Sequence, residues 1–159
     1  MGDLMIKRIR TARKRGERGQ ALAEFALLVP IFLILLFAIV DFGMGFHSWI
    51  TVTNSAREGA RLGAVHPPLD VASSPCFGEA SLDQCIEGRV RDTADLPDEA
   101  TKMTVTITNA QGQSGESVVV KVDYGYDLIT PLAGLVQFVS GSTIGPTLNL
   151  SSTADMRLE

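Results

Sequence analysis

The first residue of this 159-residue chain that could do chemistry is a carboxylate, Glu24, at the start of an apolar stretch. No charged side chain follows it from Phe25 to Val40. A charge at the mouth of an apolar helix costs free energy unless a cation or hydrogen-bond donors pair with it. In the first turn of a helix, however, a carboxylate is favoured by the helix dipole. Glu24 is therefore either a local feature of a helix start or a contact for another molecule.

Two cysteines form the second candidate site. Cys76 and Cys85 lie nine positions apart, in a segment that also holds Pro67, Pro68 and Pro75. In an oxidising compartment such a pair forms a disulfide, which restricts the unfolded chain. Two reduced, packed thiols are the alternative. Two cysteines without nearby histidines supply too few ligands for a metal, so neither a metal nor a cofactor is expected.

The two histidines do not indicate catalysis. His47 and His66 lie on or beside a helix that is predicted, as described below, to continue from a membrane span. Each is expected to be an interfacial residue or a helix-capping residue and not a catalytic base. The sequence contains no G-x-S-x-G or H-E-x-x-H motif and no phosphate-binding glycine loop. Basic residues are concentrated before the apolar stretch, and the remainder of the chain is acidic. We therefore expect neither enzymatic activity nor a nucleic-acid partner.

A membrane-spanning helix is predicted to position Glu24. Residues 20–46 are long enough to cross a bilayer core of roughly 30 Å, which needs about 20 residues. Residues 1–19 carry seven basic and two acidic side chains, a net charge of +5, whereas the chain from Asp41 onward carries a net charge of −8. By the positive-inside rule, residues 1–19 are a cytoplasmic leader and the acidic remainder lies outside the cytoplasm.

The helix is predicted to continue beyond the membrane through residues 47–65. No small-residue cleavage site ends the apolar run, which argues against a secretory signal peptide. Apolar and small residues recur at spacings of three and four, which indicates one buried helix face. The predicted face consists of Phe42, Phe46, Trp49, Thr53, Ala56, Ala60 and Ala64. Asp41 is expected to be interfacial and solvated, with pairing to a neighbouring subunit as the alternative. Glu58 and Arg61 are expected on a solvated face, where they can pair.

Residues 66–159 are predicted to form one α+β domain outside the cytoplasm. Ser81 and Gln84 have the spacing of a capping box, at the start of a short helix that ends before Leu96. A second short helix is predicted over 131–139. Three stretches alternate apolar and polar side chains, which predicts antiparallel strands with one wet face. These stretches are 103–108, 117–126 and 148–159. The buried stripe of the long helix is expected to pack on this sheet.

A resemblance to a known family rests on two stretches between Arg18 and about Val65, RGQALAEFALLVPIFLILLFAIVDFG and TNSAREGARLGAV. They resemble the TadE-like family of tight-adherence (Tad) pilus systems, whose members are prepilin-like minor pilins or pseudopilins. The resemblance implies a pilin-like fold and cleavage by a prepilin peptidase between Gly19 and Gln20. It also implies that Glu24, beside Phe25, meets the new N-terminal ammonium of a neighbouring subunit.

The function implied by the resemblance is that of a minor pilin or pseudopilin in the assembly of a Tad-type (type IVb-like) pilus or secretion filament. The implied partners are the prepilin peptidase, other pilin-like subunits, the inner-membrane platform with its ATPase, and the lipid bilayer. The implied location is the inner membrane, crossed once, or a cell-surface pilus. Phe25 stands where major pilins carry Tyr, and a large outer domain follows, which favours a minor role. The alternative is a membrane-anchored extracytoplasmic binding module.

Overall fold

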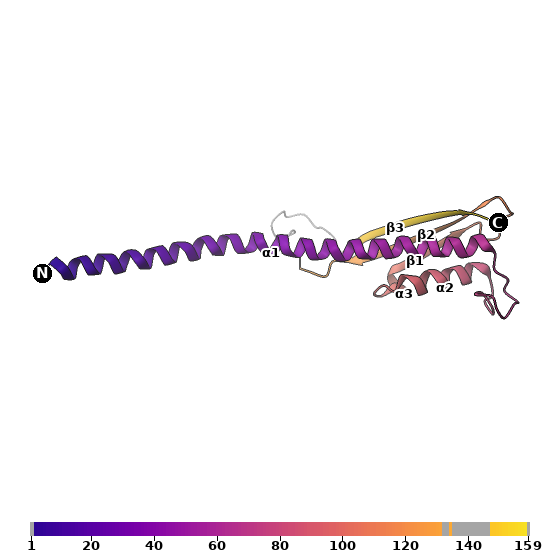
Figure 1. Ribbon diagram of the computed structural model, residues 1–159, viewed down its shortest axis with the longest axis horizontal. Coiled ribbons are helices and arrows are strands. Elements are labelled where there is room, and N and C mark those ends of the chain that lie inside the picture. The colour runs from indigo at the N-terminus through magenta and orange to yellow at the C-terminus, as the bar shows by residue number, and fades with distance from the viewer. Residues whose placement is uncertain (1, 132–133, 135–146, 159) are drawn as a thin grey trace.

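In the computed structural model a long helix extends from a small α+β domain (Figure 1). The structure describes residues 2–131, 134 and 147–158, with residues 2–18 as backbone only. The elements in chain order are α1 (Gly2–Val65), α2 (Leu82–Ala94), α3 (Glu99–Lys102), β1 (Met103–Thr108), β2 (Ser117–Asp127) and β3 (Thr147–Arg157). The predicted α+β fold is confirmed.

The long helix α1 is unbroken from Gly2 to Val65, so the predicted continuation beyond the apolar stretch is confirmed. It ends at His66, which adopts a positive φ of 46°. The backbone N–H of His66 donates to the carbonyl of Gly63 at 3.2 Å, in place of a further helical turn. Two prolines follow and cannot continue the helix. His66 therefore has the capping position that was one of its two expected roles.

The described strands form one antiparallel sheet in the order β1-β2-β3. Val120 of β2 lies opposite Ile107 of β1 and Ala154 of β3. Because side chains alternate along a strand, one face of β2 is buried. Its members are Val118, Val120, Val122, Tyr124 and Tyr126. The other face is wet and carries an ion pair between Lys121 and Asp123 at 2.8 Å. The hydrogen bond from Lys121 lowers the pKa of the Asp123 carboxyl. The predicted sheet with one wet face is confirmed.

The face of α1 that packs on the domain differs from the predicted face by one position. It consists of Asp41, Gly45, Ser48, Val52, Ser55, Gly59 and Gly63. Phe42, Phe46 and Trp49, which the sequence predicts to be buried, are 76%, 50% and 44% exposed. One residue corresponds to a rotation of about 100° around the helix. The aromatic side chains therefore point away from the packed interface, whereas Ala56 and Ala60 are buried as predicted.

Close approach of the elements explains why small residues form this face. A Cβ atom at Gly59 would lie 2.4 Å from Cγ2 of Val90 on α2 and 3.4 Å from Cγ1 of Val120 on β2. A Cβ atom at Gly63 would lie 3.0 Å from Cδ1 of Ile86, also on α2. Because α1 is held this closely by α2 and β2, aromatic side chains do not fit between them.

The short helix α2 begins as the sequence predicts. The hydroxyl of Ser81 accepts a hydrogen bond from the backbone N–H of Gln84 at 3.3 Å. The buried residues of α2 are Leu82, Cys85, Ile86, Val90 and Ala94. The single turn α3 was not predicted. Apart from Pro131 and Gly134, the helix predicted over 131–139 lies outside the described residues.

Candidate subunit-assembly site

The part of α1 from Leu22 to Val40 is apolar and largely exposed. Eight large side chains between residues 22 and 39 are 59–69% exposed: Leu22, Phe25, Leu27, Leu28, Ile31, Phe32, Leu35 and Ile39. The most apolar 18-residue window of α1 has a mean hydropathy of 2.8 and is 6% buried. A core helix of a water-soluble protein is mostly buried, so this segment is not one. By length and composition the helix from Gly19 to Val65 contains enough apolar residues to cross a membrane.

Glu24 and its neighbours lie near the start of this exposed segment. The side-chain amide of Gln20 donates a hydrogen bond from Nε2 to Oε1 of Glu24 at 3.0 Å, one helical turn away. Phe25 is 66% exposed. A Cβ atom added to Gly19 would meet nothing within 4 Å. The structure thus brings Gln20 and Glu24 together within one chain. Cleavage after Gly19 and an intersubunit contact at Glu24 and Phe25 stay predictions.

Asp41 holds the sheet against α1, and its expected solvation is wrong. The residue is 3% exposed. Its Oδ1 accepts hydrogen bonds from the backbone N–H groups of Ile129 and Thr130 at 3.0 and 3.1 Å. Its Oδ2 accepts a hydrogen bond from the hydroxyl of Thr130. The hydroxyl of Tyr126 donates to the backbone carbonyl of Asp41 at 3.5 Å. These donors allow a carboxylate to be buried, because each replaces a hydrogen bond to water.

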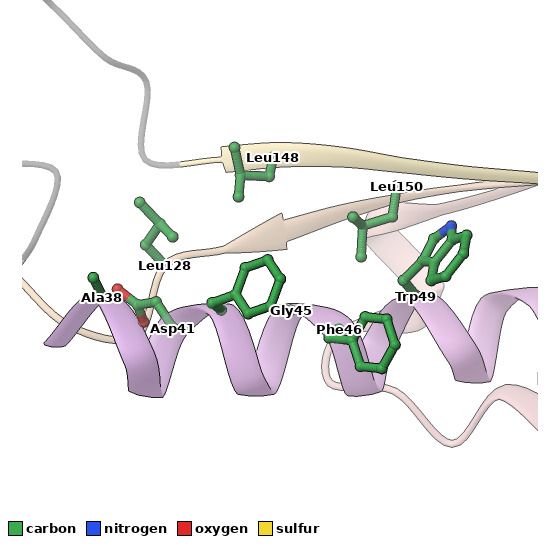
Figure 2. Close-up of a pocket in the computed structure, with 9 residues that line it drawn as sticks. Ala38, Asp41, Gly45, Phe46, Trp49, Leu128, Leu148 and Leu150 are labelled. Carbon is green, nitrogen blue, oxygen red and sulfur yellow. The ribbon is translucent and has the colours of Figure 1, made fainter. Parts of the chain in front are cut away.

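An apolar groove opens beside Asp41, between α1 and the ends of β2 and β3 (Figure 2). Its volume is about 410 Å³, and it is lined by Ala38, Asp41, Phe42, Gly45, Phe46, Trp49, Leu128, Leu148 and Leu150. The rings of Phe42 and Phe46 stack with centroids 6.3 Å apart, and those of Phe46 and Trp49 are 5.8 Å apart. Helical periodicity did not indicate this groove, because it placed the three aromatic side chains in the core.

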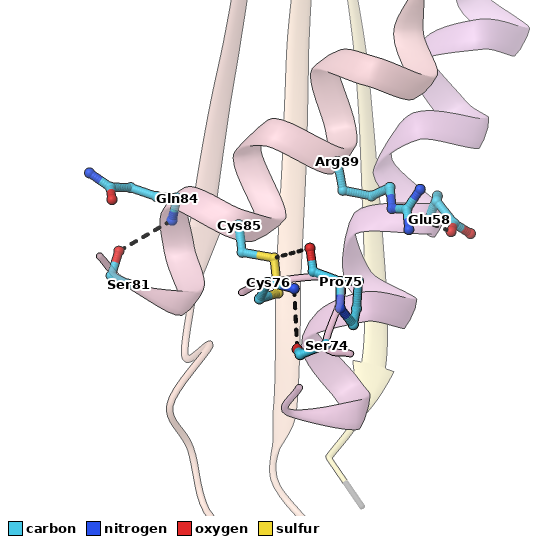
Figure 3. Close-up of a disulfide and its surroundings, with 8 residues drawn as sticks. All are labelled: Glu58, Ser74, Pro75, Cys76, Ser81, Gln84, Cys85 and Arg89. Atoms are coloured by element: carbon cyan, nitrogen blue, oxygen red, sulfur yellow. Dashed lines mark hydrogen bonds and ion pairs between the residues drawn. A yellow bond between two sulfur atoms is a disulfide. The ribbon is translucent and has the colours of Figure 1, made fainter. Parts of the chain in front are cut away.

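The disulfide lies at the other end of the domain (Figure 3). Cys76 and Cys85 are bonded, which confirms the first of the two alternatives and joins the loop after α1 to α2. Nearby, Glu58 of α1 pairs with Arg61 at 2.8 Å as predicted, and it lies 4.0 Å from Arg89 of α2. The hydrogen bond from Arg61 lowers the pKa of the Glu58 carboxyl. The disulfide and these charges hold α2 against the end of α1.

Metal-binding geometry is not found within the described part of the chain. There, no three His, Cys, Asp or Glu side chains come together in a way that could hold a metal ion. The chemistry that these residues show is hydrogen bonding at Glu24 and Asp41, together with an apolar surface along α1.

The fold and this site define a class of protein in which a long apolar helix carries a small α+β domain. Residues 19–61 match the family model described as TadE-like protein. The resemblance to the TadE-like family is therefore confirmed over this segment, which holds Gly19, Gln20, Glu24, Phe25 and Asp41. No curated protein and no solved structure matches the chain. The α+β domain lies almost entirely beyond the matched segment.

Proposed function

We propose that the chain is a minor pilin or pseudopilin, a subunit that takes part in the assembly of a Tad-type pilus or secretion filament. The observation that carries the proposal is the TadE-like match over residues 19–61, which includes the exposed, apolar part of α1. Exposed apolar side chains all round a helix are stable in a bilayer or in a bundle of similar helices, and not in water. A pilin-like subunit uses both environments in turn.

Processing at Gly19 is the first step of this proposal. The subunit is inserted in the inner membrane with residues 1–19 in the cytoplasm, and a prepilin peptidase then releases this leader. The bond after Gly19 lies inside α1, so the helix must open locally to enter a peptidase. Gly16 and Gly19 favour this opening, because each glycine weakens a helix by about 1 kcal/mol relative to alanine. A Cβ atom at Gly19 would meet nothing within 4 Å, so side-chain packing around this position does not oppose the opening.

Pairing at Glu24 is the second step. Cleavage creates an α-ammonium group on Gln20, and the carboxylate of Glu24 in a neighbouring subunit pairs with it. In an apolar environment the attraction between such charges is strong, and an unpaired charge is costly. The bond from the Gln20 side chain occupies Oε1 of Glu24. A carboxylate has about four acceptor positions, so a second donor can still bind. Other pilin-like subunits and the inner-membrane platform with its ATPase are the proposed partners.

Peptidase-dependent cleavage tests the proposal. The full chain is produced in membranes with and without a prepilin peptidase from a Tad-type system, and the extracted protein is analysed by intact mass and N-terminal sequencing. We expect a mature chain that starts at Gln20 only when the peptidase is present. Gly19→Ala should prevent cleavage. Gly43→Ala is the matched control, because a Cβ atom at either position of α1 meets nothing within 4 Å.

An uncleaved chain in the presence of active peptidase would overturn the proposed processing. The chain would then be treated as a membrane-anchored binding module, with α1 as its anchor. Cleavage of Gly19→Ala at the wild-type rate would show that the peptidase does not recognise this position.

A further inference from the structure

We infer that the outer domain itself contacts the bilayer through an apolar surface at its membrane-proximal end. This surface, here called the membrane-facing tip, consists of Phe42, Phe46, Trp49, Ile129 and Leu148. The inference rests on the membrane insertion of α1 proposed above and adds a second contact, made by residues far from the helix in sequence. Three residues of the tip belong to α1, whereas Ile129 lies two residues beyond the end of β2 and Leu148 lies at the start of β3.

The position of Glu24 sets the depth of the helix. A carboxylate is unfavourable in hydrocarbon, so the apolar core is best placed from Phe25 onward. A core of roughly 30 Å is crossed by about 20 residues, which ends it near Met44. Phe46 and Trp49 then lie about 3 and 7 Å further along the helix axis. The headgroup layer of one leaflet is about 5–7 Å thick. Aromatic side chains are enriched in this layer, because it suits their apolar rings and polar edges.

The burial of Asp41 indicates how deep the end of the domain lies in the bilayer. With the core ending near Met44, Asp41 lies about 4–5 Å inside the hydrocarbon. An uncovered carboxylate there would be costly. In this protein, however, it is 3% exposed and accepts hydrogen bonds from the backbone of Ile129 and Thr130. The segment that covers Asp41 must therefore enter the bilayer interface with it. Ile129 is suited to that position because its apolar side chain is 62% exposed.

The tip is continuous with the membrane-spanning surface of α1, which favours lipid over a second protein as the molecule that contacts it. Along α1 from Phe25 to Ala56, Asp41 is the one Asp, Glu, Lys or Arg residue, and it is buried. Along α1, the exposed apolar surface therefore runs from the span to Phe42, Phe46 and Trp49 without an exposed charge. On the domain side it continues through the groove to Leu148, which is 46% exposed and faces α1 across the groove (Figure 2).

Fluorescence quenching tests the inference, because Trp49 is the single tryptophan of the chain. Three full-length chains are reconstituted in phosphatidylcholine vesicles with or without bromine on the acyl chains. They are the wild type, Trp49→Phe with Leu148→Trp, and Trp49→Phe with Phe77→Trp. The last is the control, because Phe77 is 56% exposed in the loop after α1, at the opposite end of the domain.

We expect brominated lipid to quench Trp49 and the tryptophan at position 148 several-fold more strongly than the tryptophan at position 77. Aqueous iodide should show the reverse order. Equal quenching of all three chains would overturn the inference. Protection of Trp49 from both quenchers, increasing with protein concentration, would also overturn it and would indicate that a second copy covers the tip.

Flotation of the same vesicles after a carbonate wash separates this inference from the proposed insertion. Protein that does not float would refute both. Protein that floats, with a Trp49 that lipid does not quench, would refute only the contact between the outer domain and the bilayer. Neither readout depends on a peptidase, so the proposed processing is tested independently.

Discussion

Replacing Asp41 with alanine should release the end of the sheet from α1. The substitution removes the acceptors for two backbone N–H groups, at 3.0 and 3.1 Å, and for one hydroxyl. A hydrogen bond to a charged group contributes about 1.5–3 kcal/mol to stability. Ile129 is exposed and Thr130 is only partly buried, so water can reach their N–H groups once the segment opens. Taking the lower value for each N–H group gives a loss of about 3 kcal/mol.

Asp41→Asn should have a smaller effect, because its side-chain oxygen can still accept from both N–H groups of Ile129 and Thr130. A loss of about 1–2 kcal/mol is expected, since the hydrogen bonds are no longer charge-assisted. Asp92→Ala is the matched control. Asp92 is an exposed carboxylate on α2, and such a surface substitution changes stability by no more than about 0.5 kcal/mol.

Two measurements on the full chain in detergent micelles check this order of stabilities. Urea unfolding is followed by the emission of Trp49, which lines the groove beside Asp41. Hydrogen exchange measured by mass spectrometry reports on the backbone of residues 127–131. We expect the Asp41→Ala chain to unfold at lower urea and to exchange faster in that segment. If it matched the Asp92→Ala chain in both measurements, the role assigned to Asp41 would be refuted.

Three further predictions concern the packing of the domain. Gly59→Ala should destabilise it by about 1–2 kcal/mol in urea unfolding, because overpacking against Val90 outweighs the gain in helix propensity. Gly88→Ala should instead stabilise it by up to about 1 kcal/mol, because a Cβ atom on this exposed face of α2 meets nothing within 4 Å. Equal stabilities of the Gly59→Ala and Gly88→Ala chains would refute the close packing of Gly59 against Val90. The cysteines of the disulfide are 9 residues apart, and its reduction should lower the free energy of unfolding by about 2–3 kcal/mol. An unchanged urea midpoint would show that the disulfide does not stabilise the domain by restricting the unfolded chain. The pKa of the Asp127 carboxyl is lowered by hydrogen bonds from Thr147 and Lys102, and that of Asp123 by Lys121, so their stabilisation is present at neutral pH. It should be lost as the pH falls from about 4, the ordinary aspartate pKa, through the lower pKa of each carboxyl in the folded chain, and a urea midpoint unchanged between neutral pH and pH ~3 would be the opposite result.

Periodicity in the sequence predicted the elements of this fold because it follows directly from burial. The recurrence of Val118, Val120, Val122, Tyr124 and Tyr126 at every second position predicted β2 and its buried face. Ser81 and Gln84 predicted the start of α2, because a capping hydrogen bond depends only on neighbouring residues. These signals are local and do not require knowledge of the rest of the chain.

The predicted buried face of α1 was wrong for Phe42, Phe46 and Trp49, although Ala56, Ala60 and Ala64 of the same face are buried. In a water-soluble domain, large apolar side chains such as Phe46 and Trp49 indicate the core. Next to a bilayer, such side chains are equally stable outside the core, so hydropathy does not distinguish the lipid-facing side of α1 from the side that packs on the domain. The signal that identifies the packed face is the recurrence of small residues, among them Gly45, Gly59 and Gly63, at helical spacing. Small residues permit the close approach of α2 and β2 to α1.

The environment of Asp41 could not be predicted from the residues around it. Its hydrogen-bond donors on Ile129 and Thr130 are 88 and 89 residues away in sequence. A carboxylate near the end of an apolar helix has the same local pattern whether it is solvated or buried. The proposed partner of Glu24 could not be identified in a single chain either. Within the chain, Glu24 accepts a hydrogen bond from Gln20, whereas its proposed partner belongs to a second subunit.

Whether α1 joins one subunit to the next is tested most directly by the capture of mature protein with its neighbours. In cells with a Tad-type assembly system, the chain is cross-linked, and its association with other pilin-like subunits is measured in membrane and sheared surface fractions. We expect the Glu24→Ala chain to be cleaved after Gly19 like the wild type, as intact mass will show, and to be lost from the cross-linked complexes. Recovery of that mature chain in the complexes at the wild-type level would refute the assembly role of Glu24.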